Sequence, residues 1–153
     1  MRSAYKYLAY AVDALILLQA AAIAWAVFGL TAWIKDGNSL TTSAMESDEA
    51  PFTEAAGFMV HGISGTLVIP LVALVLLVVS FLAHVPKGVA YAGMVFGGVV
   101  VQVALGIFAH GLPFLGFVHG FWALLIFAVA LRAARQADVT TPDAVAAEAV
   151  AAR

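Results

Sequence analysis

The sequence predicts an all-α membrane protein, a four-transmembrane-helix bundle with both termini on the cytoplasmic side. Two observations carry this prediction. Of the 153 residues, 64% are hydrophobic and only 10% are charged, which is far too apolar for a soluble domain of this length. The 7 basic residues lie near the chain ends or between long apolar runs, as they do in multi-spanning membrane proteins.

Composition also excludes several classes of function. The formal net charge of -2, without any cluster of basic residues, argues against nucleic acid as a partner. The chain has no cysteine, so disulfides, thiolate ligands and iron–sulfur clusters are excluded. Any redox chemistry therefore requires a bound cofactor.

The first predicted span covers residues 8–34 and follows a short basic segment. A cleaved signal peptide is the alternative interpretation, but the apolar run is longer than such a peptide requires. Trp33 and Lys35 mark the far interface of the span. Asp13 interrupts it, and we expect this acid to lie near the headgroups facing other helices, rather than to relay protons.

An acidic loop, residues 36–56, separates the first span from the second, which covers residues 57–84. The spacing of the loop acids lacks the ligand alternation of a calcium loop, so we expect a solvated surface. Its acids are Asp36, Glu46, Asp48, Glu49 and Glu54. The second span contains His61 near its beginning and Pro70 in its middle, where the helix should kink.

The third and fourth predicted spans cover residues 89–110 and 117–135, joined by an uncharged turn. The transmembrane domain is thus residues 1–137, and residues 138–153 form a polar cytoplasmic tail. In the third span, we expect Gly93 and Gly97 to form a close-packing surface for another helix. Four spans place most basic residues on one side of the membrane, which predicts that both termini are cytoplasmic. These residues are Arg2, Lys6, Lys87, Arg132 and Arg135.

Counting along the spans places three of the four histidines near the outer end of the bundle. His61 and His119 lie about one turn into the second and fourth spans, and His110 ends the third. His84 follows His61 by 23 residues, about 35 Å of helix, so it lies at the inner surface. Gln102, Gly106 and His110 recur at intervals of four residues and share one helix face.

Two imidazoles at one depth on different helices suit the axial positions of one haem b. We therefore predict that His61 and His119 bind the haem iron. Neighbouring glycines would give the flat macrocycle room, and nearby aromatic residues would pack against it. The further residues predicted to contact the cofactor are Gly65, Gln102, Gly106, His110 and Trp122, with Gly62 and Gly120 also leaving space. The alternatives are interhelical hydrogen bonding or a zinc or copper site with His110 as third donor.

Three short motifs resemble one four-helix half of haem A synthase. They are His61-x-x-x-Gly65, Gln102-x-x-x-Gly106 and Val118-His119. The same motifs are similar to an uncharacterised family of small four-helix bacterial membrane proteins. The resemblance covers residues 57–132 and implies haem ligation by His61 and His119. Phe58 stands where the synthase pattern has a glutamate, and the cysteine pair of many synthase loops is absent.

The sequence thus predicts a b-type haem-binding integral membrane protein of a bacterial or archaeal cytoplasmic membrane. Its expected role is electron transfer, or that of an accessory haem subunit in a respiratory membrane complex. The expected partners are the lipid bilayer and either larger respiratory-complex subunits or a quinone. A non-enzymatic role is favoured because two imidazoles fill both axial positions of the iron. The alternatives are a haem A synthase-like enzyme and a cofactor-free accessory subunit of a larger membrane complex.

Overall fold

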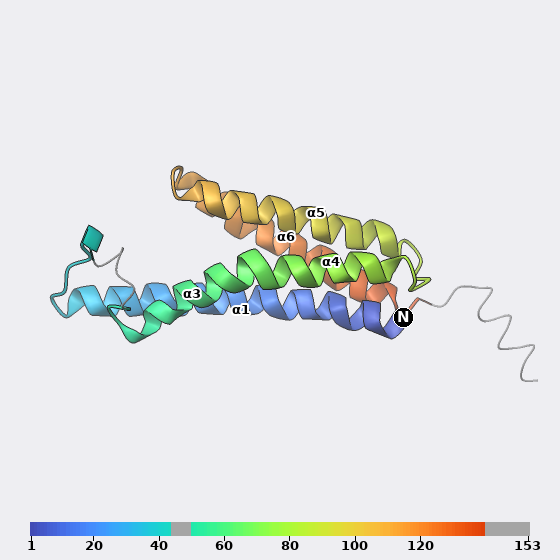
Figure 1. Cartoon of the computed structure of the whole chain (residues 1–153), viewed down its shortest axis with the longest axis horizontal. Coiled ribbons are helices and arrows are strands. Elements are labelled where there is room, and N and C mark those ends of the chain that lie inside the picture. Colours follow the sequence, from blue (N-terminus) through green and yellow to red (C-terminus); the bar gives the residue numbers. More distant parts are fainter. Residues whose placement is uncertain (44–49, 140–153) are drawn as a thin grey trace, which may run out of the picture. The chain divides into compact units, whose positions relative to one another are not determined.

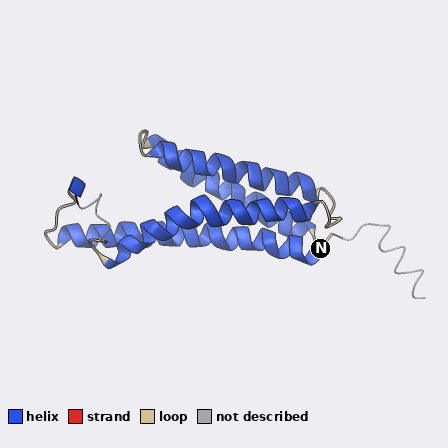
Figure 2. Cartoon of the chain, in the orientation of Figure 1, coloured by secondary structure: helices blue, strands red, loops and turns tan. Residues whose placement is uncertain are grey.

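The computed structural model describes residues 1–43 and 50–139, and within these ranges its regular secondary structure is helical throughout, without a strand (Figures 1 and 2). The elements are α1 (Arg2–Lys35), the 3-10 turn η1 (Thr53–Ala55), α3 (Ala56–Ile63), the π-helical turn η2 (Ser64–Val68), α4 (Ile69–Ser80), α5 (Gly88–Ala109) and α6 (Phe114–Gln136). Residues 44–49 of the acidic loop, which include Glu46, Asp48 and Glu49, lie outside the described residues, as does the tail from residue 140.

Four helical stretches among the described residues are long and apolar enough to cross a membrane. They are Arg2–Lys35, Thr53–Ser80, Gly88–Ala109 and Phe114–Gln136. This result confirms the predicted all-helical class and the predicted number of membrane-length helices. The first helix includes the basic segment, with Arg2 and Lys6, that we expected to precede it.

The second stretch begins and ends about four residues earlier than the predicted span 57–84. Its last turn tightens after Ser80, where the amide of Leu82 donates to the carbonyl of Val79 at 3.0 Å. His84 then adopts a positive φ of 50°, a left-handed conformation that an α-helix cannot continue. The chain therefore leaves the helix before His84 rather than at it.

The described chain divides into two compact units. The first, here called the α1–α3 unit, comprises residues 14–69. The second, here called the α5–α6 unit, comprises residues 1–13 together with the chain from Pro70 onward. Each unit has its own packing, and each contains one of the two predicted haem ligands.

In the α1–α3 unit, glycines allow two helices to approach backbone to backbone. A Cβ atom added at Gly57 of α3 would lie 2.4 Å from the carbonyl oxygen of Ala22 and 3.0 Å from the Cβ of Ala26. At Gly29 of α1, an added Cβ would overlap the side chain of Glu54. Only hydrogen fits at these positions, so glycine sets the close spacing of α1 and the segment that begins at η1.

A π-helical turn separates His61 from Pro70. Proline has no backbone N–H and cannot donate to the carbonyl four residues before it. The irregular turn Ser64–Val68 precedes this missing donor. Within and beside it, the Thr66 hydroxyl donates to the Gly62 carbonyl at 2.7 Å, and Ser64 makes the equivalent bond to Val60. The helix irregularity expected at Pro70 thus lies on the N-terminal side of the proline, next to His61. π-Helical turns of this kind are frequent at functional sites.

In the α5–α6 unit, α5 and α6 form an antiparallel pair (Figure 1). Their buried residues include Val95 and Val99 of α5 and Ile126 and Ala130 of α6. Space for these side chains comes partly from Gly98, where an added Cβ would lie 3.1 Å from Cγ1 of Ile126. At Gly98 the two helices thus meet through the side chain of Ile126.

The beginning of α1 is attached to the start of α5 and to the end of α6, which lie at the same end of this antiparallel pair. The buried Tyr5 hydroxyl donates to the carbonyl of Gly88 at 3.1 Å. Arg2 donates from Nε to the carbonyl of Ala137 at 2.7 Å, and Lys6 forms an ion pair with Asp138 at 2.8 Å. These bonds fix the chain start beside the end of α6.

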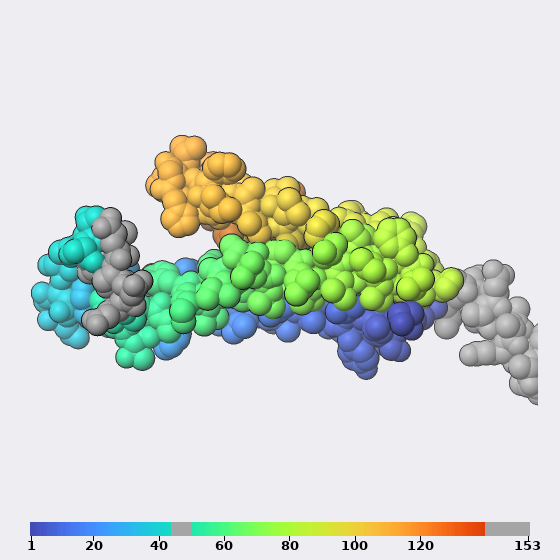
Figure 3. Space-filling view, in the orientation of Figure 1, coloured from blue at the N-terminus to red at the C-terminus, as the bar shows by residue number. Residues whose placement is uncertain are grey.

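The turn between α5 and α6 exposes large apolar side chains (orange in Figure 3). They are Phe108, Leu112, Phe114 and Phe117, and the rings of the last two are stacked with centroids 6.0 Å apart. Exposed leucine, valine and phenylalanine also recur along the other helices. Exposed apolar surface of this extent is unusual for a soluble monomer.

Candidate functional site

His61 lies on α3 and bonds to the backbone of the preceding long helix. Its Nδ1 atom is 3.2 Å from the carbonyl oxygen of Gln19 on α1. Because a carbonyl oxygen only accepts, the ring nitrogen that faces it must carry the proton. In the neutral ring this assigns the lone pair to Nε2, which is the form of imidazole that coordinates a metal.

The surroundings of His61 are organised by the side chain of Gln19. Its amide nitrogen donates to the hydroxyl of Ser64 at 2.5 Å. A Cβ atom added at Gly65 would lie 3.0 Å from the Gln19 side-chain oxygen. Gly65 therefore leaves space for this amide, and Gln19 both presents its carbonyl to the histidine and is bound on its other side by the π-helical turn.

His119 lies on α6 and makes the same kind of bond within the other unit. Its Nδ1 atom is 3.1 Å from the carbonyl oxygen of Gln102 on α5. The same reasoning assigns the proton to Nδ1 and the lone pair to Nε2. A Cβ atom added at Gly106 would lie 3.1 Å from Cε1 and 3.3 Å from Nδ1 of this ring. Gly106 thus allows the imidazole to lie against α5.

The other two histidines are arranged differently. His110 is exposed, and its Nδ1 atom bonds to the carbonyls of Gly106 and Ile107 in its own helix, at 3.1 and 3.2 Å. His84 is also exposed and bonds to the nearby carbonyl of Leu82 at 3.1 Å. Only His61 and His119 are partly buried and held by a carbonyl from another helix.

The surroundings of the other residues predicted to lie beside the haem differ from one residue to the next. The indole N–H of Trp122 donates to the carbonyl of Gly98 at 3.0 Å, so this side chain contributes to α5–α6 packing. The side-chain oxygen of Gln102 is buried and has no hydrogen-bond partner among the described residues. At Gly62 and Gly120, which adjoin the two histidines, an added Cβ would meet no atom within 4 Å. The helix surface beside each ring is therefore open.

Asp13 is the one buried carboxylate in the described part of the chain. Its exposed fraction is 6%, and neither carboxylate oxygen has a hydrogen-bond partner there. The burial agrees with the expectation that this acid faces protein. No group of three or more His, Cys, Asp or Glu side chains among residues 1–43 and 50–139 is arranged to hold a metal ion.

Sequence reasoning singled out the two histidines but missed the groups that orient them. These groups are the backbone carbonyls of Gln19 and Gln102, and a carbonyl leaves no trace in the residue type. The available signal was a glutamine within the apolar helix that precedes each histidine. No family model matches the chain, and neither a curated protein nor a solved structure matches it. Haem ligation by His61 and His119, and the resemblance to haem A synthase, stay predictions.

Proposed function

We propose that this protein is a b-type haem-binding integral membrane protein in which His61 and His119 are the two axial ligands of one haem. It transfers electrons, or serves as an accessory haem subunit, in a respiratory complex of a bacterial or archaeal cytoplasmic membrane. The four long apolar helices cross that membrane as a bundle. Both termini are cytoplasmic, because the basic residues gather on that side.

One observation carries the proposal, namely the common bonding of the two rings. Metal-binding histidines almost always donate their second ring N–H to a carbonyl, a carboxylate or water. His61 and His119 each direct Nδ1 at the carbonyl of a glutamine on another helix. Each ring is held with its proton on Nδ1, so the Nε2 atoms of the two residues would be the donors to a haem iron.

The chain's own residues orient the two histidines. The fixed carbonyl acceptors of Gln19 and Gln102 hold each ring in one orientation. His61 and His119 would hold the haem, and the bound group would supply a one-electron iron couple.

The direct test is the visible spectrum of the purified protein, oxidised and reduced. We expect reduced-haem absorption bands in the wild type, and their loss in His61→Ala and in His119→Ala. His84→Ala is the matched control, because this exposed histidine bonds only within its own segment, and it should retain the bands. Circular dichroism of each variant shows whether the helices persist.

Wild-type bands in either of the first two variants would refute the ligand assignment. A folded but unpigmented wild-type protein that takes up no added haem would favour a cofactor-free accessory subunit. Conversion of haem O to haem A by the purified protein would establish an enzyme instead.

A further inference from the structure

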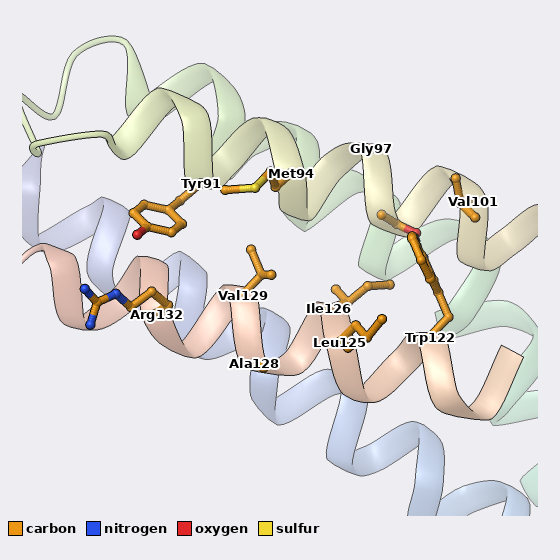
Figure 4. A pocket seen from close by; sticks show the side chains of 11 residues that line it. Tyr91, Met94, Gly97, Val101, Trp122, Leu125, Ile126, Ala128, Val129 and Arg132 are labelled. Atoms are coloured by element: carbon orange, nitrogen blue, oxygen red, sulfur yellow. Dashed lines mark hydrogen bonds between the residues drawn. The ribbon is translucent and has the colours of Figure 1, made fainter. Parts of the chain in front are cut away.

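A groove runs along one side of the α5–α6 pair. Its volume is about 650 Å³, and it lies entirely within the α5–α6 unit (Figure 4). The residues that define it are Tyr91, Gly97 and Val101 of α5 and Trp122, Val129 and Arg132 of α6. We call it the α5–α6 groove. Its lining contains no acidic residue.

Polar groups are confined to one end of this groove. Figure 4 shows Arg132 and Tyr91 at one end and Trp122 with Val101 at the other. The indole N–H of Trp122 is already bonded to the Gly98 carbonyl, so Trp122 offers the groove an apolar ring. Arg132 is exposed and makes no hydrogen bond or ion pair with another described residue. The α5–α6 groove is thus lined by apolar side chains, with the cationic side chain of Arg132 at one end.

The dimensions of the groove match one leaflet of a bilayer. Trp122 precedes Arg132 by ten residues, which corresponds to about 15 Å of helix. The hydrocarbon core of a bilayer is about 30 Å thick, so the groove extends over about half of it. Arg132 lies near the end of a membrane-length helix, where basic side chains reach the headgroup region.

We propose that the α5–α6 groove binds one acyl chain of a phospholipid with an anionic headgroup, with its phosphate paired to Arg132. The apolar walls suit the hydrocarbon chain, and the guanidinium suits a phosphate, which it binds through two parallel hydrogen bonds. Basic pockets between transmembrane helices are known to select anionic headgroups. This inference is independent of haem binding, because none of the lining residues is a proposed ligand.

The test uses the purified full-length protein in detergent and counts bound lipids by native mass spectrometry. Phosphatidylglycerol and phosphatidylcholine with identical acyl chains are compared. We expect one retained phosphatidylglycerol, bound about fivefold more tightly than phosphatidylcholine, since one basic group contributes a preference of this order. Arg132→Gln should abolish the preference. Arg135→Gln is the matched control, because Arg135 is exposed on the same helix but does not line the groove.

A second pair of variants tests the apolar part of the groove. At Gly97 an added Cβ meets no atom within 4 Å, so Gly97→Leu should fold and fill the groove. It should reduce the binding of both lipids, whereas Gly93→Leu, equally open but outside the lining, should not. Equal affinity for the two lipids, or equal effects of Arg132→Gln and Arg135→Gln, would overturn the proposal. A wild-type dimer that Gly97→Leu dissociates would assign the groove to a second copy of the chain and overturn it too.

Discussion

The α1–α3 unit and the α5–α6 unit hold a histidine in the same way but pack their helices differently. In both, the Nδ1 atom of the ring bonds to the backbone carbonyl of a glutamine on another helix, at 3.2 Å for His61 and 3.1 Å for His119. In the α1–α3 unit, however, Gly57 brings two backbones together, whereas Gly98 in the α5–α6 unit accommodates the side chain of Ile126. The orientation of a ring therefore does not depend on one particular spacing of the helices.

The glycine nearest each histidine contact also has a different neighbour. Gly65 leaves room for the flexible side chain of Gln19, and Gly106 leaves room for the His119 ring itself. Equivalent substitutions in the two units should therefore have unequal effects. A glycine that contacts a rigid group should tolerate substitution poorly. A glycine that contacts a movable side chain should tolerate it better.

The largest difference in stability loss between the two units is expected when the glycine at the backbone contact of the α1–α3 unit is substituted. Gly57→Ala places a methyl group 2.4 Å from the Ala22 carbonyl oxygen, and only movement of a whole helix relieves the overlap. We expect a loss of about 3 kcal/mol in the free energy of unfolding, measured in detergent by circular dichroism. Gly98→Ala, which meets a movable Ile126 side chain, should cost about 1 kcal/mol or less. Equal losses in the two variants would contradict the difference in packing.

A smaller difference is expected at the glycines beside the ring contacts. Gly106→Ala places its methyl group 3.1 Å from Cε1 of His119, and the hydrogen bond to Gln102 resists displacement of the ring. Its cost should be about 1–2 kcal/mol. Gly65→Ala meets only the side-chain oxygen of Gln19, which can shift slightly while the bond to Ser64 is kept, so its effect should lie within about 0.5 kcal/mol. Unfolding of the two variants under identical conditions checks the contrast, and a larger loss for Gly65→Ala would reverse it.

The smallest changes in the free energy of unfolding are expected at the glutamine side chains, and the two changes should differ in sign. Gln19→Leu removes the bond to Ser64 and should lower the free energy of unfolding by about 1 kcal/mol. Gln102→Leu removes a buried oxygen that has no partner among the described residues, so stability should stay unchanged or rise by about 1 kcal/mol. Both variants keep the backbone carbonyl that orients the histidine. Both should therefore keep the proposed haem absorption, and its loss in either would show that the side chain positions the ring.

Much of the fold could be predicted because it depends on the hydrophobicity and length of continuous segments of the chain. An apolar run of about 20 residues is long enough to cross the hydrocarbon core as a helix, so composition alone indicated four such helices. Histidine is rare within an apolar span, so the sequence also indicated His61 and His119 as candidate functional residues. The glycine positions were also noticed, but the sequence favoured a cofactor as their neighbour, whereas the structure places Gln19 at Gly65 and the His119 ring at Gly106.

By itself, the sequence determined the helical class and the number of membrane-length helices, and it singled out His61 and His119. Only the tertiary structure decided that the two partly buried histidines each face a glutamine carbonyl, that a π-helical turn precedes Pro70, and that a groove ends at Arg132. The reason is physical. Hydrophobicity and helix length are properties of a segment, whereas a backbone acceptor or a groove exists only where two segments meet, and every residue type carries the same carbonyl.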